Sequence, residues 1–131
     1  LHTLGFSCII DNGTGRTICH ERGVKDLLRI LTATPTLLAG SFIADKVVGK
    51  GAAALMTAGG VAAVYADTIS RPALEMLSTY GITVTYCTCV PNIINRSGTD
   101  ICPVERLCAD ASTPTECLPL IQSFVNSLTQ Q

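Results

Sequence analysis

The chain has 131 residues, of which 47% are hydrophobic, and its formal net charge is −1 with a pI of about 6.1. This length suits one domain around one core, and we expect residues 1–131 to form it, with residues 91–131 as a loop and closing helices. Few basic residues and no tryptophan argue against a nucleic acid partner, because phosphate contacts need clustered Lys and Arg and single strands stack on aromatic rings.

An apolar run at residues 51–66 is shorter than the ~20 residues of a membrane-spanning helix, and Gly59 and Gly60 interrupt it. The first residues lack the basic region and small-residue cleavage site of a signal peptide. We therefore expect a cytoplasmic protein without a membrane partner. The seven cysteines are then predicted to be reduced and mostly buried, since the Cys-x-x-Cys spacing of zinc sites is absent.

The first predicted elements are a hairpin and a helix. Apolar segments at residues 4–10 and 16–19 flank an Asn12-Gly13 pair, which favours the positive φ of tight turns. Apolar residues at helical spacing in "RGVKDLLRIL" predict a helix whose other face carries Lys25, Asp26 and Arg29.

From residue 38 the chain alternates between buried strands and helices. Strands are predicted at residues 38–44, 61–66 and 82–90, with an Ala-rich helix between the first two and a helix capped by Ser70 before the third. This order is typical of a parallel sheet with right-handed crossovers. Together with the hairpin, it predicts a three-layer α/β/α fold with a mixed central sheet. The segments "CPVERLCAD" and "PTECLPLIQSFVNSL" predict helices that close over the sheet.

Asp45, Lys46 and Lys50 are the only charged residues between residues 32 and 66, and they follow the first predicted parallel strand. Ligands of open α/β sheets bind at the carboxyl ends of strands, and helix N-termini attract anions. If the helix begins at Lys46, the two lysines share a face and would bind a phosphate or carboxylate, and Gly49 would let the backbone come close. The alternative is that Asp45 caps the helix and both lysines point into water.

Six segments together resemble a small family of uncharacterised prokaryotic proteins, a domain of unknown function with a cytidine deaminase-like fold. They are "ERGVKDLL", "ADKVVGKGAAAL", "YADTIS", "GI" before a strand, "VPNIINR" and "CPVE". Zinc deaminases carry His-x-Glu or Cys-x-Glu at one site helix and Pro-Cys-x-x-Cys at the next. This chain has "CHERG" and "ADKVVGK" there, so two thiolate ligands are missing, and we expect neither zinc nor another cofactor.

What the resemblance implies is a deaminase-shaped cleft refitted for a nucleotide-like ligand. The predicted ligand-binding residues come from its motifs and from the strand end: Glu21, Arg22, Asp45, Lys46, Gly49, Lys50, Asn95 and Arg96. A structural role is the alternative, for example a favourable acid in the first helical turn for Glu21 and a surface turn for Asn95 and Arg96.

The leading hypothesis is a zinc-free protein that binds an anionic, nucleotide-like small molecule. A second hypothesis is a zinc-free hydrolase or transferase in which Glu21 or Asp45 is the base and Cys102, at a predicted helix N-cap, is a reactive thiol. A third is a homodimeric interaction module without a ligand. His20 would suit a general base near pH 7, and the alternative is a histidine that faces water.

Overall fold

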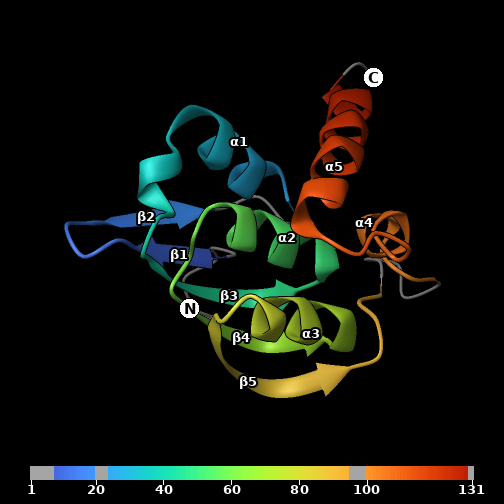
Figure 1. Ribbon diagram of the computed structural model, residues 1–131, viewed down its shortest axis with the longest axis horizontal. Helices are drawn as coiled ribbons and strands as arrows, with labels where there is room; N and C mark the ends of the chain where they lie inside the picture. The colour runs from blue at the N-terminus through green and yellow to red at the C-terminus, as the bar shows by residue number, and fades with distance from the viewer. Residues whose placement is uncertain (1–7, 20–23, 95–99, 130–131) are drawn as a thin grey trace.

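The computed structural model describes residues 8–19, 24–94 and 100–129, which pack around one hydrophobic core (Figure 1). The strands are β1 (Cys8–Asp11), β2 (Arg16–Cys19), β3 (Phe42–Val48), β4 (Ala63–Ser70) and β5 (Thr83–Val90). The helices are α1 (Lys25–Ala33), α2 (Lys50–Ala58), α3 (Arg71–Thr79), α4 (Pro103–Leu107) and α5 (Pro114–Thr129), and a 3-10 turn, η1, spans Pro35–Leu37.

The strands form one mixed sheet in the order β2-β1-β3-β4-β5. β1 is antiparallel to both of its neighbours, whereas β3, β4 and β5 are parallel to one another. The hairpin turns at Gly13, whose φ of 90° lies in the left-handed region, and Asn12 Oδ1 accepts hydrogen bonds from the N–H groups of Thr14 and Gly15. The predicted hairpin and mixed sheet are confirmed.

The described helices lie on one side of the sheet or at its carboxyl edge. The connections run in one direction along the sheet, from β2 through β3 and β4 to β5, so right-handed crossovers place α1, α2 and α3 on the same face. α5 packs against α2, and α4 contacts both. The predicted third layer is not found in the described part of the chain. The apolar run "LLAGSFIA" suggested cover on both faces, yet Phe42 is 46% exposed on the face that lacks helices.

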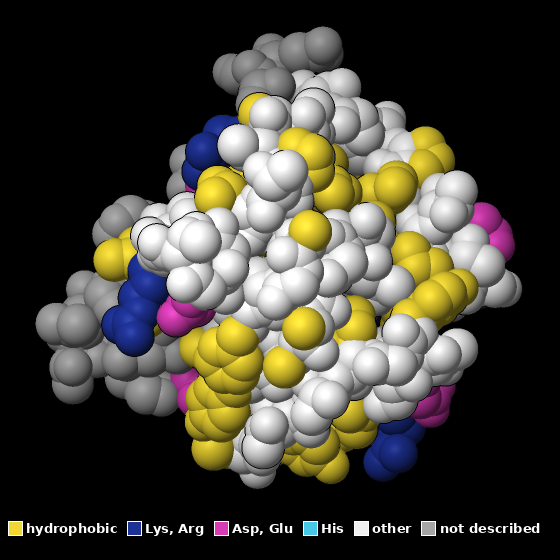
Figure 2. Space-filling model, turned by 60° about the vertical axis from the view of Figure 1, so that its left-hand side comes forward, with side chains coloured by type: hydrophobic (Ala, Val, Ile, Leu, Met, Phe, Trp, Pro, Cys, Tyr) yellow, Lys and Arg dark blue, Asp and Glu magenta, His cyan; other side chains and the backbone are white. Residues whose placement is uncertain are grey.

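Charged residues make up only 15% of the chain, and the surface reflects this. Figure 2 shows patches of hydrophobic side chains among uncharged polar ones, with the charged side chains towards the margins of this view. Ile18 and Phe42, whose chain neighbours Cys19 and Ile43 are buried in the core, lie on the open face and remain more than 40% exposed. The sheet is therefore protected from water chiefly on its helix side.

The first parallel strand, β3, begins later in the chain than predicted. The η1 turn precedes it, and Leu38, expected at the start of the strand, is fully buried at the end of that turn. Asp45 and Lys46 lie within β3, and α2 begins at Lys50 with Gly49 as its N-cap residue. The expected helical face shared by Lys46 and Lys50 is therefore wrong, and so is the alternative in which Asp45 caps the helix. The two adjacent charged residues suggested that the strand ends before them. Successive residues of a strand point to opposite faces of the sheet, however, so Asp45 and Lys46 can both belong to β3.

The side-chain alternation of the parallel strands changes phase near their carboxyl ends. In β3, Asp45 and Val48 are both buried on the helix side, although strict alternation would place them on opposite faces. The pairing of β3 with β4 is interrupted at the same level, at Lys46 and Asp67. Lys46 and Val47 consequently both face the side of the sheet without helices.

The central helix, α2, is surrounded by the other helices and lies over β3. Its residues from Gly51 to Met56 are all buried, and most are small, which lets neighbouring elements approach closely. A Cβ atom added at Gly51 would overlap Cγ1 of Val104 on α4. Gly51 thus sets how closely α4 packs on α2.

Gly51→Ala should lower the free energy of unfolding by about 1–3 kcal/mol, because displacement of Val104 outweighs the helix-propensity gain of ~1 kcal/mol. Urea denaturation measures the change. In the double variant Gly51→Ala/Val104→Ala, the second substitution should relieve part of the first, so the two energies should not add. Gly15→Ala, where nothing lies near the added carbon, is the control. Strict additivity would contradict the contact.

Candidate functional site

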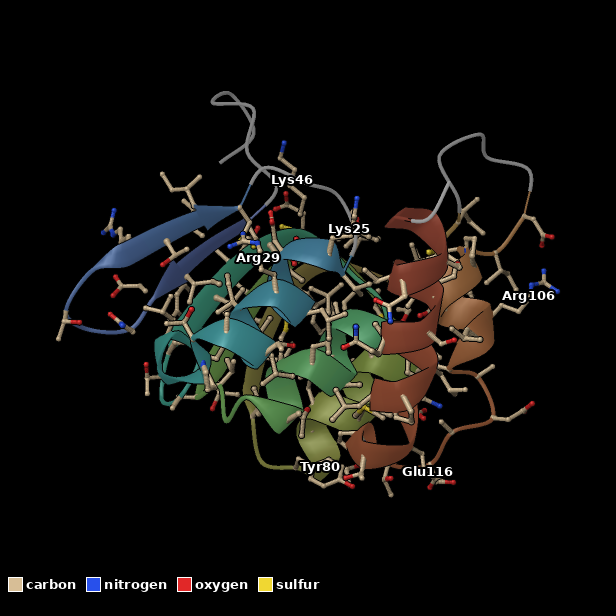
Figure 3. All side chains as sticks on the ribbon, turned by 90° about the horizontal axis from the view of Figure 1, so that it is seen from above. Lys25, Arg29, Lys46, Tyr80, Arg106 and Glu116 are labelled. Atoms are coloured by element: carbon tan, nitrogen blue, oxygen red, sulfur yellow. The ribbon has the colours of Figure 1, made fainter. Side chains whose placement is uncertain are left out.

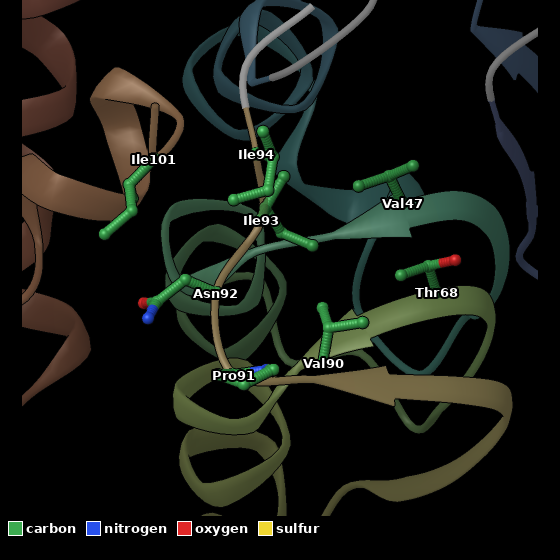
Figure 4. Close-up of a pocket in the computed structure, with 8 residues that line it drawn as sticks. All are labelled: Val47, Thr68, Val90, Pro91, Asn92, Ile93, Ile94 and Ile101. Atoms are coloured by element: carbon green, nitrogen blue, oxygen red, sulfur yellow. The ribbon is translucent and has the colours of Figure 1, made fainter. Parts of the chain in front are cut away.

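A pocket of about 530 Å³ lies at the carboxyl ends of β3, β4 and β5 (Figure 4). Its floor has one residue from each strand: Val47, Thr68 and Val90. Its wall is formed by residues 91–94, which follow β5, and by Ile101, which precedes α4. The chain turns from β5 towards α4 across the ends of the neighbouring strands, as Figure 1 shows. We call this site the carboxyl-end pocket.

The carboxyl-end pocket is mostly apolar. Six of its eight lining residues are Val, Ile or Pro, and the other two are Thr68 and Asn92. An apolar enclosure with a few polar groups is the usual form of a small-molecule site. Chemically, this open concavity can contact an apolar or aromatic group on one side, and its lining includes one hydroxyl and one amide.

The wall of the pocket is fastened by Glu105 of α4, a carboxylate only 3% exposed. Glu105 Oε1 accepts a hydrogen bond from the N–H of Ile93 at 3.1 Å, and Oε2 accepts one from the N–H of Lys50 at 2.6 Å. The carbonyl of Ile93 accepts a further bond from the N–H of Cys102 at 2.8 Å. One buried carboxylate therefore joins α4, the pocket wall and the first turn of α2.

The N-terminus of α2, predicted to receive an anionic ligand, holds the negative charge of Glu105. Helix N-termini favour such a charge because their N–H groups and the helix dipole point at it. A Cβ atom at Gly49 would lie 2.9 Å from Glu105 Oε2, so the glycine makes room for this carboxylate. Lys50 Nζ donates to the carbonyl of Ala109, just after α4, at 3.1 Å. Neither Gly49 nor Lys50 lines the pocket.

Asp45 lies beneath the helix layer and is 8% exposed, opposite Cys8 of β1. Its Oδ1 accepts a hydrogen bond from the N–H of Val47 at 3.3 Å. Burial raises the pKa of Asp45 to about 7, and the charge of Asp67 adds to this, whereas the N–H groups of Val47 and Lys46 act in the opposite direction. The sheet separates this carboxyl group from the pocket, whose floor faces the other side.

A polar cluster borders the pocket on the open face of the sheet. Lys46, Asp67 and Cys87 lie at one level of β3, β4 and β5, as the paired residues on either side show. Tyr65 Oη donates to Asp67 Oδ1 at 2.9 Å and lies 3.0 Å from Cys87 Sγ. The contact with Cys87, followed by that with Asp67, raises the pKa of Tyr65. Lys46 extends away from the helices, as Figure 3 shows, and directly precedes the floor residue Val47.

The structure brings only part of the predicted site together. None of the predicted residues that it describes lines the pocket, and two of them adjoin lining residues in the chain: Lys46 precedes Val47, and Cys102 follows Ile101. Cys102 is the N-cap residue of α4, as expected, and its half-buried side chain makes no capping hydrogen bond. The remaining candidates lie outside the described residues: His20, Glu21, Arg22, Asn95 and Arg96. Their roles stay predictions.

Sequence reasoning missed Glu105 as the residue that positions the wall. A signal was present, because Glu105 is the acidic residue of "CPVE" and stands between the buried Val104 and Cys108 in a short helix. Thr68 and Asn92 were missed as well, although both lie where a predicted strand ends and within quoted motifs, "YADTIS" and "VPNIINR". Position after a strand was thus a better guide to the pocket than charge.

Within the described ranges, no three His, Cys, Asp or Glu side chains are grouped so that they could hold a metal ion. In the same part of the chain, no helix combines the length and apolar character needed to cross a membrane.

The family model described as TM1506, domain of unknown function (DUF1893), matches residues 1–125. The chain belongs to the DUF1893 family. A crystal structure of a DUF1893 family protein (TM1506) from Thermotoga maritima, at 2.70 Å resolution, is similar to this DUF1893 protein: the TM-score is 0.82 and the identity 27%, over 90% of this chain and 80% of that one. No curated protein matches the chain significantly. The expected relation to a family of unknown function is confirmed.

Glu105→Ala should lower the free energy of unfolding of this DUF1893 protein by about 2–4 kcal/mol, because the buried N–H groups of Lys50 and Ile93 lose their acceptor. Amide hydrogen exchange should become faster at both groups. Glu75→Ala, on the exposed side of α3, is the matched control and should change stability by less than ~0.5 kcal/mol. Unchanged exchange at Lys50 and Ile93 would show that Glu105 does not fasten the wall.

The raised pKa of Asp45 predicts that the folded state becomes less stable as the pH rises. Its folded pKa of about 7 lies above the value of ~3.9 in an unfolded chain, so between these values the folded state binds more protons and ionisation opposes folding. Stability should fall from about pH 4 to pH 7 and then level off. Asp45→Asn mimics the neutral carboxyl group and should remove this decline, gaining about 2–4 kcal/mol on the wild type between pH 4.5 and pH 8.

Urea denaturation over this pH range measures the effect, with Asp110→Asn, an exposed residue, as the control. The control should follow the wild-type curve. A carboxyl pKa near 4 for Asp45 by NMR, or parallel curves for Asp45→Asn and wild type, would contradict the expectation.

Proposed function

We propose that this DUF1893 protein is a zinc-free, cytidine deaminase-like protein that binds a nucleotide-like small molecule in the carboxyl-end pocket. One observation carries the proposal: an apolar pocket of about 530 Å³ at the ends of three parallel strands, where open α/β sheets bind their ligands. The hairpin that leads into α1 and the strand that leads into α2 support the deaminase-like architecture, since the resemblance implies both.

The start of α2 does not fit the zinc site of a deaminase. Gly49 and Lys50 stand there instead of thiolate ligands, and the space beside them is taken by the carboxylate of Glu105. A catalytic zinc needs three protein ligands and an open position. The proposal therefore contains no metal-dependent step.

The lining residues indicate the chemistry of the ligand. Val and Ile side chains suit the faces of an aromatic ring, and Thr68 and Asn92 can hydrogen bond to its edge. Lys46, next to the pocket floor, can attract an anionic group attached to that ring. The side chain of Asp67 lies at the same level of the sheet as Lys46. It favours a part of the ligand that carries hydroxyl groups over a second anionic group. A nucleoside monophosphate combines these parts.

Saturation-transfer NMR with cytidine, uridine, adenosine and their 5′-monophosphates tests the proposal. At least one monophosphate should bind, and Thr68→Phe, which fills the pocket floor, should weaken its binding by at least about tenfold. Thr85→Phe adds the same ring at an exposed position of β5 outside the pocket and is the matched control. The proposal fails if no compound of the panel binds, or if Thr68→Phe binds like the wild type.

The same NMR assay tests whether Lys46 interacts with the phosphate group of the ligand. Lys46→Met should weaken binding of the monophosphate by about five- to tenfold and leave binding of the nucleoside unchanged, because only the phosphate interacts with the ammonium group. Lys50→Met should affect neither, since the Lys50 ammonium group is bonded to Ala109. Equal effects of the two substitutions would contradict the placement of the phosphate.

A thiol-dependent hydrolase or transferase is a second candidate function, favoured by the contact between Tyr65 and Cys87. Cys87 is exposed and lies 3.0 Å from the phenol oxygen, whereas Asp45 is buried on the other side of the sheet. Because the phenol donates its proton to Asp67, the Cys87 thiol is the donor in this contact and the Tyr65 oxygen is the acceptor beside it. In the NMR mixtures, product signals that form with the wild type and not with Cys87→Ser would favour this function over binding alone.

A further inference from the structure

Two cysteines that the candidate site does not use lie opposite each other in the β1–β2 hairpin. The register of the sheet pairs Cys8 of β1 with Cys19 of β2. Opposite residues of antiparallel strands point to the same face of a sheet, and their Cα atoms are roughly 4.5–5.5 Å apart. Both side chains are buried, so this face is the helix side. Disulfides span Cα separations of about 4.4–6.8 Å, so the backbone holds this pair at a distance that a disulfide can bridge.

A buried carboxyl group lies on the other side of Cys8. In the sheet β1 stands between β2 and β3, and the register pairs Cys8 with Asp45 of β3 as well as with Cys19. The three residues therefore form one row across three strands, and none of them is more than 8% exposed. Neighbouring Cβ atoms in such a row are about 4.5–5.5 Å apart, which places the carboxyl group within reach of the Cys8 thiol.

The surroundings of the row make Cys19 the more acidic of the two thiols. The contact with Cys8 lowers the pKa of Cys19, and the guanidinium group of Arg29 on α1 acts in the same direction. Burial and the charges of Asp26 and Asp45 oppose this effect. The contact with Cys19, burial and the charge of Asp45 raise the pKa of Cys8. Cys19 is therefore the better nucleophile, and Cys8 needs a base, for which Asp45 is placed.

We propose that Cys8 and Cys19 are an oxidative modification site, at which hydrogen peroxide converts the two thiols into a disulfide and Asp45 takes the proton of Cys8. The observation behind it is the register that places these three side chains in one buried row. Cys19 is the last residue of β2, a strand of four residues at the edge of the sheet, where local opening costs the least and admits a small oxidant.

The oxidation proceeds in two displacement steps. The Cys19 thiolate, formed by loss of its proton to solvent, attacks one oxygen of hydrogen peroxide; the O–O bond breaks, and the hydroxide that leaves is protonated to water. Cys8 then gives its proton to Asp45 and attacks the sulfur of the Cys19 sulfenic acid. The S–S bond forms, the S–O bond breaks, and the leaving hydroxide takes the proton from Asp45. The protein loses two electrons and two protons, and one peroxide becomes two water molecules.

The disulfide would tie the last residue of β2 to β1 and limit the opening of this edge of the sheet. From Cys19 the chain continues towards α1 through residues 20–23, which include the predicted ligand-binding residues Glu21 and Arg22. Oxidation would fix the point at which this segment starts. The ligand of the carboxyl-end pocket takes no part in the reaction, and the test requires none.

Peptide mapping of the full chain after treatment with hydrogen peroxide tests the proposal. Tryptic cleavage places Cys8 and Cys19 in separate peptides, residues 1–16 and 17–22, each without another cysteine. After the remaining thiols are alkylated, the two peptides should appear as one linked species, which dithiothreitol separates. In Cys8→Ser, the linked species should be absent and Cys19 should be recovered as a sulfenic acid trapped by dimedone.

The control is Cys117→Ser, which removes a buried thiol of α5 and should give the same linked species as the wild type. The exposed Cys87 reports the progress of oxidation in the same digest. The proposal is overturned if the two peptides are still separate when Cys87 is fully oxidised, or if Cys19 forms its disulfide with a cysteine other than Cys8.

Asp45→Asn tests the proton transfer. After catalase removes the peroxide, the sulfenic acid at Cys19, followed with dimedone, should convert to the disulfide at least about tenfold more slowly at pH 8 than in the wild type, because Cys8 has lost its base. The wild-type rate of this step should rise as Asp45 ionises, around its pKa of about 7, and the variant should lack this rise. Asp110→Asn, at an exposed position, is the matched control.

The greater stability expected of Asp45→Asn would make opening rarer and lower the sulfenic acid and the disulfide together, without slowing the conversion of one into the other. Equal conversion rates in Asp45→Asn and the wild type would overturn the role of Asp45, even if the disulfide forms.

Discussion

The buried carboxylate of Glu105 is the interaction on which the carboxyl edge of this protein depends. α2 is the most enclosed helix, and its first turn has N–H groups that no side chain of its own N-cap residue can satisfy, because that residue is Gly49. Glu105 supplies the acceptor from α4 and uses its other oxygen for Ile93. The same group therefore completes a helix, positions a pocket wall and fixes a short helix that would be marginal alone.

The two faces of the sheet carry different charged residues. Asp45 and Lys46 are adjacent in the chain, yet Asp45 lies under the helices and Lys46 on the open face. Burial raises the pKa of Asp45, so that its ionisation opposes folding, whereas Lys46 lies beside the floor of the pocket. The interrupted pairing beside them places Val47 on the open face, where it becomes part of the pocket floor. The position of the pocket thus follows from a local irregularity of β3 and β4.

Local sequence patterns predicted the helices and strands well, but they did not predict the contacts between residues far apart in the chain. Ser70 caps α3 by accepting a hydrogen bond from Ala73, and Pro103 starts α4, both as the sequence indicated. These features depend on neighbours in the chain. The hydrogen bond between Glu105 and Lys50 joins residues that are 55 positions apart in the chain, and no periodic pattern of the sequence predicts it. The sequence analysis placed an anionic ligand at the start of this helix, whereas in the structure the carboxylate of Glu105 accepts the hydrogen bond from the N–H of Lys50 there.

The edge strand β5 influences how copies of this protein associate with one another. In the described chain β5 pairs with β4 alone, so its outer row of backbone amide and carbonyl groups faces solvent. Its sequence, "TVTYCTCV", contains neither a charged residue nor a proline, the two devices that most often prevent a strand from recruiting another one. Crowding or partial unfolding would therefore lead to association first along this border, where an extended segment of a second molecule could continue the sheet.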